Sequence, residues 1–193
     1  MPPKARVTRE DILNAAFDLI RAEGQEALSV RAVAKRLGCS TQPVLYNFAT
    51  VEELKDAVYE KADGFHTSYI LPRDGEGADA LLELGLNYVR FGHEEKHLFR
   101  FLFESDRFGG MDFKGLLRWP GSDELVAILA EALGCPAAEA EKLFMTFFAV
   151  AHGLASLLCN NAMEYDETEC AAMLETVFNG ALAALTSKGE EYA

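Results

Sequence analysis

The segment S-V-R-A-V-A-K-R-L-G-C-S-T-Q-P-V-L-Y-N-F, Ser29 to Phe48, carries the clearest structural signal in this chain. Between Val30 and Leu37, apolar residues recur at i, i+3, i+4 and i+7, which predicts the buried face of a short helix. Gly38 favours a helix end because glycine adopts positive φ without strain, and Pro43 suits the first turn of a second helix. Two short helices joined by such a turn form a helix-turn-helix, whose second helix enters the major groove of DNA.

The second of these helices carries side chains suited to contacting base edges. Gln and Asn pair bidentately with adenine, and Thr can meet the thymine methyl group. Val44, Leu45 or Phe48 would anchor the helix inward, and Ser40 or Thr41 would cap it. The alternative is an ordinary helical hairpin with polar residues facing solvent. We predict that the DNA-binding residues are Arg31, Ser40, Thr41, Gln42, Val44, Leu45, Tyr46 and Asn47.

The net charge of −13 argues against nucleic acid as a partner unless the charge is unevenly distributed. Residues 1–48 hold seven Lys or Arg against five Asp or Glu, a net of +2, and the remainder carries −15. An acidic body would repel DNA except where the basic end faces it. Lys4, Arg6 and Arg9 at that end are either a basic arm for the DNA backbone or a solvated terminus.

Helical patterns also surround this segment. Thr8 and Gly24 bound a preceding helix, and Thr50 with Glu53 has the spacing of a capping box for a fourth helix that continues to Pro72. After a short polar loop the rest is expected to be helical, with no competing strand pattern. The expected helices span about 78–95, 98–105, 122–133, 136–159 and 167–187.

An aromatic group in the second half is the candidate ligand pocket. Pockets for small apolar ligands are built from such side chains and a few polar groups, although ordinary core packing is the alternative for each residue. We predict a small apolar or aromatic effector bound by Tyr88, Phe91, Phe103, Trp119, Phe144, Phe147, Phe148 and His152.

The segment from Leu143 to Leu158 is apolar nearly all round, so several neighbours must cover it. The next helix has an apolar stripe from Leu174 to Leu185. Together these offer more apolar face than one subunit is expected to bury. We predict a homodimer through these two helices, which would bind an imperfectly palindromic operator.

One motif points to a different class of protein. His93, Glu94 and His97 form H-E-x-x-H, the pattern of a zinc hydrolase in which Glu acts as general base. The charged residues between the histidines suit a helix end, and no third ligand follows, so we expect no metal, no cofactor and no enzyme. The four cysteines are scattered and form no C-x-x-C pair, and no continuous apolar span is long enough to cross a membrane. The first residues are basic but are not followed by the pattern of a leader peptide. We therefore predict a cytoplasmic protein that does not enter a membrane.

The strings V-R-A-V-A-K-R-L-G, S-T-Q-P-V and T-V-E-E-L resemble the DNA-binding segment of the tetracycline-repressor (TetR-like) family. Two later strings, H-L-F-R-F-L-F-E-S-D and A-H-G-L-A-S-L, resemble the C-terminal domain of one subgroup. The resemblance implies a ligand-responsive repressor. It predicts a three-helix DNA-binding head over residues 1–50, followed over 51–193 by a linker helix and a larger helical body for ligand binding and dimerisation. The chain departs from the family at Val51, where a Lys is common, and at Leu45, where the usual Tyr is displaced to Tyr46.

Overall fold

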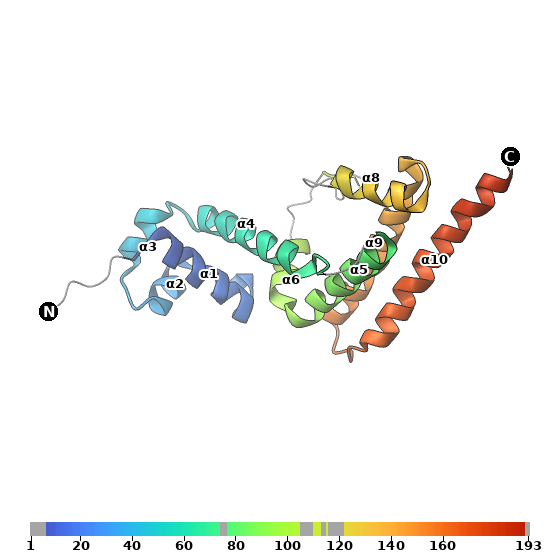
Figure 1. Cartoon of the computed structure of the whole chain (residues 1–193). Helices are drawn as coiled ribbons and strands as arrows, with labels where there is room; N and C mark the ends of the chain where they lie inside the picture. Colours follow the sequence, from blue (N-terminus) through green and yellow to red (C-terminus); the bar gives the residue numbers. More distant parts are fainter. Residues whose placement is uncertain (1–6, 74–76, 105–109, 113–114, 116–121, 192–193) are drawn as a thin grey trace. The chain divides into compact units, whose positions relative to one another are not determined.

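The computed structural model describes residues 7–73, 77–104, 110–112, 115 and 122–191 (Figure 1). Within these ranges the chain is helical and has no strand, which confirms the predicted all-α class. Contacts divide the chain into two units. We call residues 1–68 with 95–105 the head, and residues 69–94 with 106–193 the body. The functional boundary expected at residue 50 stays a prediction, and the contacts group most of the fourth helix with the head.

The head is built around its first helix. Its elements are α1 (Arg9–Glu23), η1 (Gln25–Ala27), α2 (Val30–Arg36), α3 (Thr41–Asn47), most of α4 (Val51–Ile70) and α6 (Lys96–Phe103). Helix α1 contacts α2, α3 and α6. Ile12, Ile20, Val33 and Leu54 are completely buried, so one small apolar core holds these short helices together.

Capping residues fix the helix ends in the head. Thr8 Oγ1 accepts a hydrogen bond from the Asp11 backbone N–H at 3.1 Å, and the Asp11 carboxylate accepts from the Thr8 N–H at 2.8 Å. At the start of α4, Thr50 Oγ1 accepts from the Glu53 N–H at 3.0 Å, as its spacing predicted. The Glu53 carboxylate, however, accepts from the N–H of Ala49 rather than that of Thr50, at 2.8 Å.

The body packs around one central helix. Its elements are α5 (Gly77–Glu94), α8 (Ser122–Leu133), α9 (Ala137–Asn160) and α10 (Glu167–Glu191). Helix α9 packs against α5, α8 and α10, and α10 also runs along α5 (Figure 1). Among the described residues, α9 is long and apolar enough by composition to cross a membrane, with a mean hydropathy of 1.6 over its most apolar stretch. Its three packing partners are those of a core helix in a globular domain.

Two glycines let α5 approach α9 closely. A Cβ atom placed on Gly92 would lie 2.7 Å from Ala155 Cβ and 3.0 Å from the Ala155 carbonyl oxygen. One placed on Gly85 would lie 2.5 Å from the Phe147 ring. The absence of side chains at these two positions therefore sets the distance between the two helices.

We predict that Gly92→Ala destabilises the protein although alanine favours a helix. Overpacking against the Ala155 backbone costs about 1–3 kcal/mol. The higher helix propensity of alanine relative to glycine stabilises the protein by only about 0.5–1 kcal/mol. The free energy of unfolding from urea denaturation, followed by circular dichroism at one protein concentration, measures the difference.

Gly64→Ala in α4 is the matched control. A Cβ atom there meets nothing within 4 Å, so the same change should raise the free energy of unfolding by about 0.5–1 kcal/mol. Equal effects of the two substitutions would show that the contact between Gly92 and Ala155 does not limit the packing of α5.

Candidate nucleic-acid interface and ligand pocket

Helix α3 has one buried side and one exposed side. Val44 is 0% exposed, and Phe48, just after the helix, is 1% exposed. On the other side Leu45 is 49% and Tyr46 81% exposed, next to exposed Thr41 and Gln42. We call Thr41, Gln42, Leu45 and Tyr46 the recognition surface. Large side chains this exposed on a short helix are available to a groove of DNA.

The turn before α3 has the geometry that its sequence predicts. Ser29 Oγ caps α2 by accepting from the Ala32 N–H at 3.2 Å. Gly38 has a φ of 63°, a conformation that glycine adopts without strain, and the Cys39 N–H closes the helix end on the Ala34 carbonyl at 3.0 Å. Ser40 occupies the N-cap position of α3 but makes no side-chain capping bond. The helix-turn-helix is therefore present, although the Ser40 side chain does not form the predicted capping bond.

Two predicted DNA-binding residues have other roles in the structure. Val44 is completely buried, so its side chain anchors α3 and is unavailable to DNA. Asn47 is half-buried, and its Nδ2 donates to the Pro43 carbonyl at 2.8 Å. These two residues position the recognition surface rather than extend it. The remaining predicted residues, Arg31, Ser40, Thr41, Gln42, Leu45 and Tyr46, are all exposed.

Helices α1 and α2 of the head carry several cations. Arg31 and Lys35 are exposed, and Arg36 faces Asp18 at 3.8 Å. The Arg9 guanidinium lies 4.4 Å from the centre of the Phe48 ring, a cation–π contact that holds the first residue of α1 beside the end of α3. Lys4 and Arg6 lie outside the described residues. Arg9 therefore places a positive charge beside the end of α3, and phosphate contacts require charges of this kind.

Three of the predicted ligand-binding residues meet in the body. The Tyr88 hydroxyl and His152 Nδ1 share a hydrogen bond of 2.9 Å, and the Phe148 ring lies 5.4 Å from that of Tyr88 and 5.8 Å from that of His152. Burial raises the pKa of Tyr88 well above its usual range, so the hydroxyl stays neutral. A neutral hydroxyl that is hydrogen-bonded to an imidazole beside an aromatic ring is the kind of polar group that orients a small ligand.

The other predicted members have different surroundings. Phe144 and Phe147 are buried in the body, where Phe147 fills the space over Gly85, and Phe91 packs against Tyr69 at 5.3 Å. Phe103 belongs to the head, where it packs against His66 at 5.0 Å and Phe99 at 5.1 Å. Trp119 lies outside the described residues. The aromatic residues are therefore divided between two cores.

The H-E-x-x-H motif does not lie on one helix. Helix α5 ends at Glu94, α6 begins at Lys96, and Glu95 between them has a non-helical backbone. His93 stacks on Tyr165 at 4.9 Å, and His97 lies against Gly24. A zinc hydrolase needs both histidines on one face of a continuous helix, so the structure does not support this alternative.

The structure also contains an aliphatic cavity that sequence patterns did not reveal. A cavity of about 160 Å³ lies in the body beside α5 and α8, and its lining side chains are all aliphatic. Leucines in such helices look the same in the sequence whether they line a cavity or fill a core. Only the three-dimensional arrangement distinguishes the two.

Comparisons with known proteins agree with this architecture. The family model described as "Tetracyclin repressor-like, C-terminal domain" matches residues 81–180, and that described as "Bacterial regulatory proteins, tetR family" matches residues 12–58. The tetracycline repressor protein class D of Escherichia coli is 34% identical over 79 residues, which cover 40% of this chain and 36% of the relative. The class H protein of Photobacterium damsela subsp. piscicida matches equally well. The match thus spans little more than a third of these curated relatives.

Solved structures show the same fold. A TetR-family transcriptional regulator from Streptomyces coelicolor superposes with a TM-score of 0.71 at 20% identity, covering 95% of this chain and 83% of the other. A TetR-like regulator from Rhodococcus sp. RHA1 has a TM-score of 0.65 at 17% identity, covering 93% and 98%. The helix-turn-helix of the head and the helical body match the two family models in chain order, and the chain belongs to the TetR family of bacterial regulatory proteins.

Proposed function

We propose that this chain is a ligand-responsive transcriptional regulator, acting as a repressor, that binds a palindromic operator as a homodimer. The observation that carries the proposal is the recognition surface on α3, whose polar and aromatic side chains are exposed while Val44 and Phe48 hold the helix in the head. The protein acts by binding rather than by catalysis, without a metal or cofactor, and in the cytoplasm.

DNA recognition is assigned to two sets of residues. Gln42 and Tyr46 of the recognition surface contact base edges, and Arg31 contacts the phosphate backbone. Residues 1–48 hold only seven Lys or Arg, so counterion release on binding should be small and affinity should depend only modestly on salt. Sequence specificity then comes mainly from the exposed side of α3.

Dimerisation is assigned to the exposed sides of α9 and α10. Leu174 and Phe178, two residues of the predicted apolar stripe of α10, are buried within the subunit and face its own core. A different side stays exposed, with Leu157 at 51% on α9 and Met173 at 46% on α10. A Cβ atom on Gly153 or Gly180 would meet nothing within 4 Å. Two exposed helices with apolar and very small residues can pack closely on their twofold copies.

The path of the chain supports control of the head by the body. Helix α5 belongs to the body, and the next residues, 95–105, belong to the head. There the Glu95 carboxylate accepts from Arg21 Nε at 2.8 Å and also from Arg21 Nη2, and Arg21 lies over the Phe65 ring at 5.0 Å. A ligand near Tyr88 and His152 that shifts α5 would therefore act through the peptide chain on α6, which packs against α1.

Coupling of this kind is reciprocal. If the ligand lowers affinity for the operator, the operator lowers affinity for the ligand by the same factor, about 5- to 150-fold in typical cases. The linker helix α4 is another covalent connection between the two units, because its last two residues belong to the body.

We predict that Gln42→Ala and Tyr46→Ala lower affinity for the operator by about 5- to 150-fold, the equivalent of about 1–3 kcal/mol of lost base contact. Affinity for random DNA should change much less, because base contacts specify while phosphate contacts position. The operator is selected from random duplexes with the unaltered protein, and affinities are measured by fluorescence anisotropy.

Two controls accompany these variants. Arg31→Ala should weaken binding to both DNAs equally, and Thr67→Ala, at an exposed position of α4, should affect neither. Equal losses on both DNAs for Gln42→Ala and Tyr46→Ala would mean that the recognition surface lies elsewhere.

We also predict that Leu157→Glu converts the dimer into monomers at micromolar concentration. A carboxylate buried in an apolar interface without a partner should raise the dissociation constant by at least about 100-fold. Sedimentation velocity measures the change. Met163→Glu is the control, because Met163 is also 51% exposed but lies between α9 and α10. A Leu157→Glu protein that remains dimeric would place the interface on another face.

A further inference from the structure

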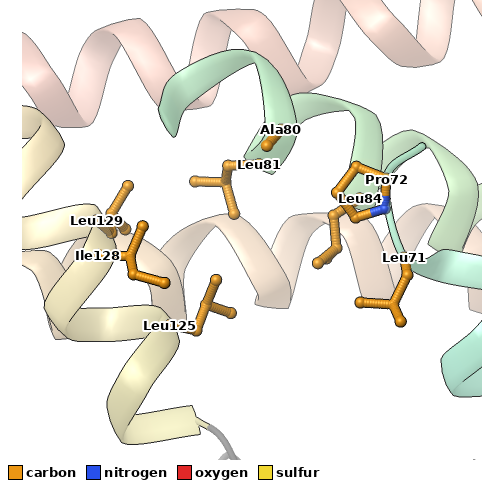
Figure 2. Close-up of a pocket in the computed structure, with 8 residues that line it drawn as sticks. All are labelled: Leu71, Pro72, Ala80, Leu81, Leu84, Leu125, Ile128 and Leu129. Atoms are coloured by element: carbon orange, nitrogen blue, oxygen red, sulfur yellow. The ribbon is translucent and has the colours of Figure 1, made fainter. Parts of the chain in front are cut away.

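The aliphatic cavity of the body is formed by three segments of the chain, and Figure 2 shows its eight lining side chains. Leu71 and Pro72 lie just after the end of α4, whereas Ala80, Leu81 and Leu84 belong to α5. Helix α8 supplies Leu125, Ile128 and Leu129. None of these eight residues belongs to the aromatic group around Tyr88 and His152. The cavity is therefore a second candidate site in the body.

The cavity has a buried floor and an open rim. Leu81 is 4% and Leu129 3% exposed, whereas Leu71 is 55% and Ile128 52% exposed. The rim on the α4 side is held to α5, because the Glu83 carboxylate accepts from the Arg73 backbone N–H at 3.2 Å. A ligand could enter past Leu71 and Ile128 without any rearrangement of the floor.

The lining defines the chemistry of the occupant. The eight side chains contain only carbon and hydrogen, so a polar group that left water to enter would find no hydrogen-bond partner among them. None of the eight is aromatic, so none can stack on a flat ring. An alkyl chain needs neither kind of contact and gains from leaving water.

The volume limits the length of that chain. A dry cavity of about 150 Å³ lined by aliphatic and aromatic side chains holds benzene, so about 160 Å³ accommodates roughly six carbons. Each methylene buried in the cavity should raise affinity about fourfold. Carbons beyond that length would remain in solvent and add little.

We propose that this cavity binds the saturated alkyl chain of an amphiphilic ligand to a depth of about six carbons, with the polar head group left at the rim. This inference rests on the proposed function, since it names the chemical class of an effector for the body. It assigns the hydrocarbon part of that effector to Leu71, Leu81, Leu84 and Ile128 rather than to the aromatic group.

The test is a chain-length series on the full-length protein. Isothermal titration calorimetry with 1-butanol, 1-pentanol, 1-hexanol, 1-octanol and benzyl alcohol should show affinity rising about fourfold per methylene up to about six carbons. It should then level off, with benzyl alcohol weaker than 1-hexanol. Affinity that is independent of chain length, or benzyl alcohol that binds as tightly as 1-hexanol, would overturn the proposal.

Two variants locate the site. Ala80→Leu should fill the cavity and lower affinity for 1-hexanol at least tenfold, whereas Ala132→Leu, at an exposed position of α8 outside the lining, should leave it unchanged. At the rim, where folding is less at risk, Ile128→Ser should lower the affinity about fivefold and the similarly exposed Met163→Ser should not. Unchanged 1-hexanol affinity in both cavity variants would contradict the assignment.

The same preparations separate this inference from the proposed function. Operator binding without any alcohol tests the regulator, and alcohol binding without DNA tests the cavity. A protein that binds the operator but no alcohol would refute only the cavity proposal, and one that binds 1-hexanol but selects no DNA would refute the proposed function. If Ile128→Ser abolished dimerisation in sedimentation and no alcohol bound, the rim would instead be a contact with a second copy of the chain.

Discussion

The burial of Val44 and Phe48 is the constraint on which the head depends. A helix as short as α3 is not stable alone in water, so its conformation depends on packing against α1 and α2. Anchoring one side fixes the rotation of the helix, and Leu45 and Tyr46 are then directed to solvent. The same anchoring residue, Phe48, receives the guanidinium of Arg9. The packing of these two residues thus sets both the exposed side of α3 and the position of Arg9.

In the body, the close approach of α5 and α9 has a comparable role. Gly85 and Gly92 leave room for Phe147 and Ala155, and the side of α9 that carries these residues is buried. The opposite side of α9 is left exposed, with Gly153 and Leu157 on it. A helix that is apolar on all sides is therefore covered within the subunit on some sides only. Helix α9 thus combines the hydropathy of a membrane span with the packing partners of a core helix.

Connectivity links recognition to the body. The chain leaves the head within α4, builds α5 in the body and returns to the head for α6. On its return, Glu95 pairs with Arg21 and His97 lies against Gly24, so the start of α6 is tied to the end of α1. Packed helices shift between discrete arrangements rather than deforming smoothly. A change at the end of α5 therefore has a direct covalent route to the core beneath the recognition surface.

The helical class, the helix-turn-helix and most helix ends could be predicted from the sequence, because they depend on local signals. Capping groups such as Thr8 and Ser29, the positive φ of Gly38 and the apolar period over Val30 to Leu37 act between residues close in the chain. Which apolar residues lie in the core, line the cavity or stay exposed depends on tertiary packing and could not be predicted from the sequence. Phe103 and Phe148 look alike in the sequence but lie in different units, and His93 and His97 are separated by a helix break. The cavity between α5 and α8 was also invisible, because empty space depends on contacts between distant segments that no local pattern records.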